Sequence, residues 1–436
     1  MSRILREMET MPPDALAELQ LERLRRQLAY LSSRSPFYRE KLRSAGMEPD
    51  ELRSLDDLKA IPPTTKDELR EHNREIVCAP DEDIVDIGAT TGTTGDAVIL
   101  PTTQNDWDEL VELLMRGMHG LGVQKRDVFQ VAVAFDQLFS LGAPLDDALK
   151  NLGVTVVRTG PGNRRRQVEL MRRLGTTCIM ATPDFMLLLA EEAREMGFDP
   201  RKDFSLRMGV FIGHGLYTAD WHPNALNRRV AEAWHIEVYS DYGSMEMLAG
   251  LIECAEHGGH HVPADQLLVE VIDPDTGKPL PPGEPGELVA THLGRTGTPL
   301  LRFRQGDITT IQTEPCRCGR TTPRVMAVLD RLDHMLKIKG VSVYPRQVEQ
   351  ALMEIPEVKG YLVEAYTEDS GGDGLRIRVS AGGDEETVLD KVRKAVKARA
   401  RILPDHLETA PQEEITRLWY SEDTRKPRKF RDLRQR

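Results

Sequence analysis

Residues 89–95 read Ala89-Thr90-Thr91-Gly92-Thr93-Thr94-Gly95, a run in which threonine hydroxyls stand between glycines. Glycine lets the backbone bend and approach an anion closely, while hydroxyls and successive amide N–H groups donate hydrogen bonds to its oxygens. The flanking segments 86–88 and 97–100 read as strands, so the run is predicted to be a hairpin-like turn that holds phosphate. It is not the Gly-x-x-x-x-Gly-Lys-Ser/Thr loop that opens a helix. The same composition is typical of an ordinary turn, so its interpretation depends on motifs farther along the chain.

Composition sets the class of protein. The chain has 436 residues, 40% hydrophobic and 29% charged, as expected for a globular protein of two or three domains. The net charge of −12 argues against nucleic acid as a partner, since duplex binding needs a concentrated basic face. The charged residues 1–7 do not resemble a signal peptide, and no apolar run approaches a membrane span in length. We expect a cytoplasmic protein acting on a small molecule, with no nucleic acid or membrane partner; a homodimer is left open.

Three segments differ in their sequence pattern. Residues 1–83 form a helical arm and lead-in, with leucines at helical spacing between residues 14 and 45. Over residues 84–330, short apolar strands alternate with amphipathic helices, which predicts an α/β body that becomes β-rich from about residue 265. Residues 334–436 are predicted to form a small α+β domain. Strands are expected at 128–135, 154–157 and 178–181, and helices at 106–119, 143–152, 164–174 and 184–196.

Further motifs follow the Thr/Gly loop in order. They read Ser240-Asp241-Tyr242-Gly243-Ser244-Met245-Glu246, Leu301-Arg302-Phe303-Arg304-Gln305-Gly306-Asp307, Arg331-Leu332-Asp333 and Lys337-Ile338-Lys339-Gly340. Lys426 lies near the end of the chain. In this order and at these separations the motifs resemble those of the adenylate-forming superfamily, which includes acyl-CoA synthetases and luciferase-like enzymes. The resemblance covers nearly the whole chain.

More narrowly, the chain resembles the phenylacetate–CoA ligase family. The likeness is carried by Leu19-Gln20 to Leu24, Ser35-Pro36-Phe37-Tyr38-Arg39, Pro62-Pro63-Thr64-Thr65-Lys66-Asp67-Glu68-Leu69 and Gly340-Val341-Ser342-Val343-Tyr344-Pro345. It implies an α/β fold, with a large adenylate-forming N-terminal domain and a small, mobile α+β C-terminal domain. It also implies an AMP-forming acid–CoA ligase. Such an enzyme joins a carboxylic acid to the α-phosphate of ATP, releasing pyrophosphate, and CoA then displaces AMP.

The resemblance assigns roles around the phosphates. The residues that would grip them are Thr90, Thr91, Thr93, Thr94 and Gly95, with Thr91 counted among the catalytic residues. Glu246 would hold the Mg²⁺ that bridges the phosphates. Lys426 would contact the α-phosphate and the substrate carboxylate during adenylation. Glu246 is also compatible with a surface acid, and Lys426 with a solvated basic tail.

Other residues are assigned to the nucleoside. By resemblance, Tyr242 offers a flat face to adenine, next to Gly243, and Asp241 an acceptor for the adenine amino group. Asp307 can accept from both ribose hydroxyls, and Arg331 can donate to the ribose and phosphate region. Tyr242 is also compatible with a core aromatic, and Asp307 with a turn former after Gly306.

The small domain is implied to serve the second half-reaction. Gly340 and its loop would lie beside the pantetheine of CoA. Relatives rotate this domain about the residue that matches Asp333, so that one enzyme serves both half-reactions.

Two segments depart from the family pattern. Where the family loop commonly continues Gly-Lys-Pro, this chain has Gly95-Asp96-Ala97, so an acid replaces a mobile cation over the pyrophosphate. The adenine-side segment, usually Gly-Gly-Glu or Gly-Ala-Glu, is Gly213-His214-Gly215 here. Because of the first departure, the affinity for ATP stays open. Because of the second, it stays open whether His214 faces the nucleotide or the solvent.

A metal site is predicted from four side chains. They are Cys254, His261, Cys316 and Cys318, with His260 as the alternative to His261. Three thiolates and one imidazole favour a closed tetrahedral zinc site, which would be structural because it leaves no open position. Relatives often carry a similar cluster. Chance clustering of cysteines is the alternative.

The acid is the least determined part of the function. By resemblance its pocket is formed by segments 134–139 and 159–162 and by the residues before Tyr242. Phe135 and Phe139 suit an aryl or medium-sized acid, although core packing explains them equally well. Two other functions remain open. One is an adenylating enzyme without CoA transfer, like the synthetase that attaches AMP to the deazaflavin coenzyme of methanogens, and the other is a non-catalytic nucleotide-binding relative.

Overall fold

The fold is taken from a computed structural model that describes residues 7–90, 97–136, 138–332, 336–338, 341–367, 372–419 and 428–434. The chain divides into two compact units, a larger one up to Val328 and a smaller one from Leu329. Within the described ranges, no helix is both long enough and apolar enough to cross a bilayer.

The first helices pack on the β-rich part of the larger unit. The helical pattern of residues 14–45 divides into α2 (Pro13–Arg34) and α3 (Pro36–Ser44). The break falls at Ser35, whose hydroxyl accepts from the Tyr38 amide and caps α3. Leu24 and Leu28 are fully buried in one core with Leu301 and Phe303. The remaining short helices here are α4 (Lys66–Glu71), α5 (Asn73–Ile76) and 3₁₀ turns at Pro49–Glu51, Leu55–Ala60 and Asp81–Asp83.

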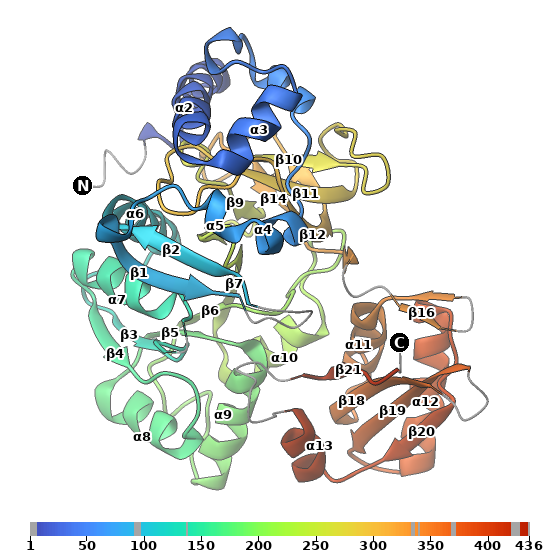
Figure 1. Ribbon diagram of the computed structural model, residues 1–436. Coiled ribbons are helices and arrows are strands. Elements are labelled where there is room, and N and C mark those ends of the chain that lie inside the picture. The colour runs from blue at the N-terminus through green and yellow to red at the C-terminus, as the bar shows by residue number, and fades with distance from the viewer. Residues whose placement is uncertain are drawn as a thin grey trace. The chain divides into compact units, whose positions relative to one another are not determined.

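A six-stranded sheet forms the centre of the larger unit (Figure 1). Its strand order is β4-β3-β5-β6-β7-β8, with β3 to β7 parallel and β8 antiparallel to β7. The strands are β3 (Val128–Val131), β4 (Thr155–Arg158), β5 (Cys178–Ala181), β6 (Met208–Phe211), β7 (Glu237–Ser244) and β8 (Ala249–Ile252).

Helices cover both faces of this sheet. They are α6 (Gln104–Gly120), α7 (Gly142–Asn151), α8 (Arg164–Leu174), α9 (Pro183–Glu195) and α10 (Ala225–Trp234). Helices α6 and α7 pack on each other, and α8, α9 and α10 pack in succession on the other side (Figure 1). The predicted α/β body is therefore confirmed. One predicted strand is wrong in length: β3 ends at Val131 and not at residue 135, because the chain leaves the sheet for a bend in which Leu138 has φ +60°.

Antiparallel strands make up the rest of the larger unit. The hairpin of β1 (Ile84–Ala89) and β2 (Ile99–Thr103) precedes the central sheet. Strands β10 (Leu267–Ile272), β11 (Gly286–His292) and β12 (Phe303–Thr309) pair in succession. A small sheet has the order β13-β14-β9. Its strands are β9 (His260–His261), β13 (Ile311–Gln312) and β14 (Arg324–Val325).

The smaller unit is an α+β sandwich around the sheet β20-β19-β18-β21. Alternate residues of β18 face opposite sides of the sheet. Val363 lies in one core with Val348 of α11 and Val392 of α12, whereas Leu362 contacts Ile415 of α13 on the other face. The elements are β15 (Asp330–Arg331), β16 (Leu336–Ile338), β17 (Val341–Val343), α11 (Pro345–Met353), β18 (Val358–Thr367), β19 (Asp373–Ala381), α12 (Glu385–Ala400), β20 (His406–Thr409), α13 (Gln412–Trp419) and β21 (Phe430–Asp432).

Candidate active site and metal site

Two segments predicted for the nucleotide lie where β6 and β7 end, next to the end of β5. Thr182 follows β5, Gly213 follows β6, and Asp241 to Ser244 form the end of β7. Because these strands are parallel, their carboxyl ends meet at one edge of the sheet, where open α/β sheets bind their ligands. Gly243 is required there because a Cβ atom would collide with the Ala249 carbonyl oxygen across the β7–β8 hairpin.

The structure brings Tyr242 and Asp307 together from strands 65 residues apart. The Tyr242 hydroxyl donates to Asp307 Oδ2 at 2.7 Å, and both side chains are buried. Asp307 lies on β12 directly after Gly306, which has φ +76°. The Gly306 amide donates to Glu287 Oε1 at 3.1 Å, so a neighbouring strand holds this segment in place. The pair joins the adenine-side motif to the ribose-side motif.

Asp241 is a buried acid. Its Oδ1 atom has no hydrogen-bond partner among the described residues, and burial raises its pKa from 3.8 to about 7. A buried carboxylate without a donor is costly, so a ligand that donates a hydrogen bond to this position would relieve that cost. The adenine amino group predicted to bind here is such a donor.

Glu246 is half-buried in the turn that joins β7 to β8. Ser244 caps this turn, because its hydroxyl oxygen accepts from the Met247 amide at 3.0 Å. The same hydroxyl donates to Gln305 Oε1 at 2.8 Å. Sequence reasoning quoted Gln305 within the Asp307 motif but gave it no role, since nothing local shows that it reaches Ser244. The Gln305 amide nitrogen is buried without a partner among the described residues.

The base of the Thr/Gly loop lies near the Glu246 turn. Thr90 closes the hairpin: its amide donates to the Val98 carbonyl and its hydroxyl oxygen accepts from the Val98 amide, each at 3.0 Å. A Cβ atom at Gly88 would collide with Ser140 Oγ and lie 3.0 Å from Met245 Cε, so β1 approaches the neighbour of Glu246 closely. Four of the predicted phosphate ligands, Thr91, Thr93, Thr94 and Gly95, lie outside the described residues.

In the segment that departs from the family pattern on the adenine side, His214 has a partner nearby. Gly213 has φ +82°, a conformation that glycine adopts without strain. His214 Nε2 lies 3.1 Å from Asp184 Oδ2 at the start of α9. His214 therefore faces a carboxylate at the carboxyl edge of β5.

The remaining predicted residues belong to the smaller unit. Arg331 is exposed on β15 and is described with that unit alone. Lys426, Gly340 and Asp333 lie outside the described residues.

Four side chains form a compact cluster of potential metal ligands. Their ligand atoms all lie within 4.8 Å of one another, and they belong to Cys254, His261, Cys316 and Cys318. The Cys254 and Cys316 sulfurs are 3.7 Å apart, and Cys318 Sγ lies 3.6 Å from His261 Nε2. A disulfide would need a sulfur–sulfur distance of about 2.05 Å. Contact between the Cys254 and Cys318 thiols raises the pKa of Cys254 and lowers that of Cys318.

The backbone explains how this cluster forms. Cys254 follows β8, and His261 lies on β9, which pairs with β14. Cys316 and Cys318 lie in a tight turn, in which the Gly319 amide donates to the Cys316 carbonyl at 2.9 Å and Gly319 has φ +91°. Three short segments that are separate along the chain thus bring the four ligands together.

His260 points away from the cluster. Neighbouring residues on a strand face opposite sides, and the His260 ring nitrogens lie 3.0 Å from the Val325 carbonyl oxygen and 2.9 Å from Ser240 Oγ. Burial lowers its pKa to about 4, so the ring is neutral. The structure therefore groups His261, and not the alternative His260, with the cysteines.

A buried network beside the cluster was missed by sequence reasoning. Glu253 accepts from the Ser240 amide, from the Tyr217 hydroxyl and from His257 Nδ1, each at 2.9 Å. Burial raises the pKa of Glu253, while its carboxylate raises that of His257. The position next to Cys254 is the only sequence signal that could have drawn attention to it.

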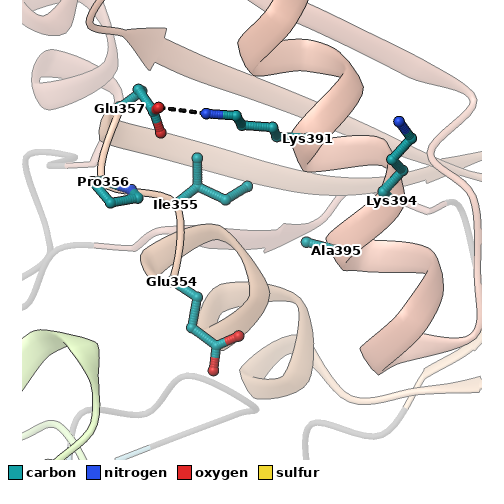
Figure 2. Close-up of a pocket in the computed structure, with 7 residues that line it drawn as sticks. All are labelled: Glu354, Ile355, Pro356, Glu357, Lys391, Lys394 and Ala395. Atoms are coloured by element: carbon teal, nitrogen blue, oxygen red, sulfur yellow. Dashed lines mark hydrogen bonds and ion pairs between the residues drawn. The ribbon is translucent and has the colours of Figure 1, made fainter.

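A separate hollow of 620 Å³ lies on the smaller unit. Figure 2 shows Ile355, Pro356 and Ala395 along it, with Glu357 paired to Lys391. Its other charged side chains are also paired, Glu354 with Arg399 and Lys394 with Asp390. The hollow contains none of the predicted site residues.

Comparisons with known proteins agree on one family. The family model described as AMP-binding enzyme matches residues 17–294, and that of the AMP-binding enzyme C-terminal domain matches residues 340–434. A phenylacetate–coenzyme A ligase of Thermus thermophilus is 36% identical over 94% of this chain and 91% of its own length. A phenylacetate–coenzyme A ligase of Escherichia coli is 32% identical over 88% of this chain and 87% of its own length.

Solved structures of similar proteins contain ligands. A 2-hydroxyisobutyryl-CoA ligase in the postadenylation state, in complex with an acyl-AMP, has a TM-score of 0.85 and 26% identity, over 99% of this chain and 92% of that one. The same ligase with its acyl-AMP and CoA, in the thioesterification state, has a TM-score of 0.70 and 27% identity over the same shares.

Proposed function

The chain belongs to the phenylacetate–CoA ligase family of AMP-binding enzymes and is an AMP-forming acid–CoA ligase, for which we propose an aryl or medium-sized carboxylic acid as substrate. The reaction has two steps. ATP activates the acid to an acyl-adenylate with release of pyrophosphate, and the CoA thiol then takes the acyl group and releases AMP. The observation that carries this assignment to particular residues is the Tyr242–Asp307 hydrogen bond at the sheet edge. It lies beside Asp241, whose Oδ1 atom has no partner among the described residues.

The geometry supports a division of labour over the nucleotide. We assign adenine stacking to Tyr242, acceptance from the adenine amino group to Asp241, and the ribose hydroxyls to Asp307. The Tyr242 hydroxyl keeps the Asp307 carboxylate oriented before ATP arrives, which lowers the cost of ordering it on binding.

Charge accumulates at the α-phosphate during adenylation, so fixed donors and cations there lower the barrier. Glu246 is proposed as a ligand of Mg²⁺, which would supply positive charge at the phosphates. The contact between Gly88 and Met245 supports this, since it brings the base of the Thr/Gly loop near the Glu246 turn. Lys426 beside the α-phosphate, Gly340 beside pantetheine and rotation about Asp333 remain predictions from the family resemblance.

The class of carboxylic acid substrate is inferred from the segments that follow β3 and β4, where its pocket is proposed. Phe135 and Phe139 are half-buried and pack against the main core just beyond β3. In the sheet, β3 and β5 are neighbours, but the chain passes from β3 to β4 on one side and from β5 to β6 on the other. The connections after β3 and β5 therefore run in opposite directions, and such a switch point opens a ligand crevice. The two aromatic side chains there, together with the phenylacetate ligases among the relatives, support an aryl acid.

Structural zinc is proposed for the cysteine–histidine cluster. A tetrahedral zinc ion with bonds of about 2.3 Å to sulfur and about 2.0 Å to nitrogen sets two sulfurs about 3.8 Å apart, and sulfur and nitrogen about 3.5 Å apart. The distances between Cys254 and Cys316 and between Cys318 and His261 are 3.7 and 3.6 Å. The cluster therefore fits zinc, which would join the short segments that carry its ligands.

The substrate is tested with a panel of carboxylic acids. A thermal-shift screen of aryl and alkyl acids with ATP and Mg²⁺ selects ligands, because a ligand of the folded state raises the melting temperature. AMP release by the selected acids is then measured with and without CoA. We expect an arylacetic or similar acid to give AMP in step with a CoA thioester. Pyrophosphate release without AMP release, whether or not CoA is present, would favour an adenylating enzyme without CoA transfer. Preference for short alkyl acids would contradict the aryl assignment.

A further inference from the structure

Ser240 is held from two directions on β7, two residues before Tyr242. Its backbone amide donates to Glu253 Oε1 at 2.9 Å. Its side-chain hydroxyl lies 2.9 Å from His260 Nε2. Ser240 is itself buried, so these partners replace water.

Both partners of Ser240 are the immediate neighbours of cluster residues. Glu253 precedes Cys254, and His260 precedes His261. Two ligand segments that are separate along the chain therefore converge on one residue of the nucleotide-binding strand.

The histidine contact has a defined direction. His260 Nδ1 lies 3.0 Å from the Val325 carbonyl oxygen on β14, which can only accept. Nδ1 therefore carries the proton, and Nε2 accepts from the Ser240 hydroxyl. The His260 ring also lies near Tyr242, the side chain assigned to adenine, with a distance of 5.8 Å between the two ring centroids.

Glu253 is fixed by further contacts to the segment that follows it. It accepts from the Tyr217 hydroxyl and from His257 Nδ1, and the His257 amide donates to the Cys254 carbonyl at 3.0 Å. A shift of Cys254 would therefore move Glu253 and its contact with Ser240.

We propose that the cluster of Cys254, His261, Cys316 and Cys318, when it holds zinc, positions the adenine-binding end of β7 through Ser240. Ser240 and His260 are then positioning residues that act through Tyr242, and do not themselves touch the substrate. This inference rests on the proposed function, because it assumes that Tyr242 binds adenine and that the cluster binds zinc. Residues behind metal ligands fix those ligands in place, and here the same contacts extend to the nucleotide site.

The energetic basis is linkage between two sites. Zinc joins the Cys254 and His261 segments, so Glu253 and His260 keep the spacing that Ser240 needs. Without zinc, that spacing depends on short strands, turns and the hydrogen bonds of Glu253 and His260. If zinc favours the nucleotide-binding geometry by some factor, then nucleotide binding must favour zinc retention by the same factor.

The test is equilibrium binding of a nucleotide, with AMP as the probe, to zinc-loaded and zinc-depleted protein. We expect zinc removal to weaken binding by wild-type protein by roughly fivefold or more. Ser240→Ala should weaken AMP binding in the zinc-loaded state. Zinc removal should then reduce the affinity of this variant for AMP only slightly more, because its hydrogen bond between residue 240 and His260 is already lost. Ser240→Thr, which keeps the hydroxyl, should restore the dependence on zinc. Thr176→Val is the matched control, since it removes a buried hydroxyl that bonds to Gln130 instead.

A second measurement applies if zinc-depleted protein unfolds. The rate of zinc transfer to a chelating dye is followed with and without AMP. AMP should slow the transfer from wild-type protein and from Thr176→Val, but not from Ser240→Ala. Two results would overturn this inference but leave the proposed function standing. One is equal slowing in Ser240→Ala, and the other is a nucleotide affinity of folded wild-type protein that does not change when zinc is removed. Failure of zinc-loaded wild-type protein to bind AMP overturns the proposed function as well.

Discussion

The Tyr242 hydroxyl donates to the Asp307 carboxylate at 2.7 Å, which joins the end of β7 to the middle of β12. Each of these strands carries one of the two motifs that suggest nucleotide binding. A second contact between the motifs, from Ser244 to Gln305, lies two residues farther along β7 and two residues earlier on β12. The proposed nucleotide site is thus held together by two hydrogen bonds between the same pair of segments.

The first prediction concerns this pair. Asp307→Asn should weaken ATP binding by tenfold or more, because a charged acceptor contributes about 1.5–3 kcal/mol. Tyr242→Phe keeps the flat face and loses only the hydroxyl, so we expect a loss of a few-fold. The Michaelis constant for ATP and the dissociation constant of AMP measure both effects. Tyr30→Phe, which removes the bond to the Thr296 carbonyl, serves as the control. A larger loss in Tyr242→Phe than in Asp307→Asn would contradict the assigned roles.

The second prediction concerns Glu246. Glu246→Gln should lower turnover on the order of tenfold or more at limiting Mg²⁺, because the variant loses a charged ligand. Higher Mg²⁺ should recover part of the loss. Titrating Mg²⁺ at saturating ATP measures this, with Glu284→Gln, an exposed acid, as the control. An unchanged Mg²⁺ dependence would remove Glu246 from the proposed site.

Zinc content provides the third prediction. Purified protein should contain about one zinc ion per chain by elemental analysis. Cys316→Ser should lower the melting temperature and zinc content more than it lowers initial turnover at saturating ATP, since the site has no open coordination position. Cys78→Ala changes a cysteine outside the cluster and should keep its zinc. Wild-type protein without zinc would end this assignment.

The fourth prediction is a dependence of stability on pH. Burial raises the pKa of Asp241 from 3.8 to about 7, so the folded state favours its protonated form. That contribution to stability is present at low pH and is lost as pH rises through 7. Asp241→Asn removes the charge, so its stability relative to wild type should increase between about pH 4 and pH 7 and level off at higher pH. Urea unfolding at several pH values measures the difference, and a constant difference would show that Asp241 is not buried as described.

Local patterns predicted much of the larger unit. The helix at 164–174 and the strand at 178–181 have the predicted bounds, because apolar spacing and flanking turns define both. Residues 128–135 read as one strand, since nothing in their composition shows where the chain leaves the sheet. The break at Ser35 is a finding of the structure: Ser35 caps a new helix whose first residue is Pro36.

The site divides in the same way. Tyr242 and Asp307 were recognised from their motifs, but their hydrogen bond depends on how β7 and β12 approach each other. His261 was preferred over His260, but the physical reason comes only from the fold. Adjacent strand residues face opposite sides, and spacing does not show which side holds the cysteines. Gln305 gave no signal for the same reason, since its partner Ser244 lies 61 residues away.

Isotope exchange between pyrophosphate and ATP in the absence of CoA tests the central claim most directly, because it reports reversible formation of an acyl-adenylate. We predict exchange that requires Mg²⁺ and an aryl or medium-sized carboxylic acid. Addition of CoA should then give AMP and acyl-CoA in equal amounts. Release of ADP and phosphate in place of AMP and pyrophosphate, or no exchange with any acid of the panel, would contradict the account.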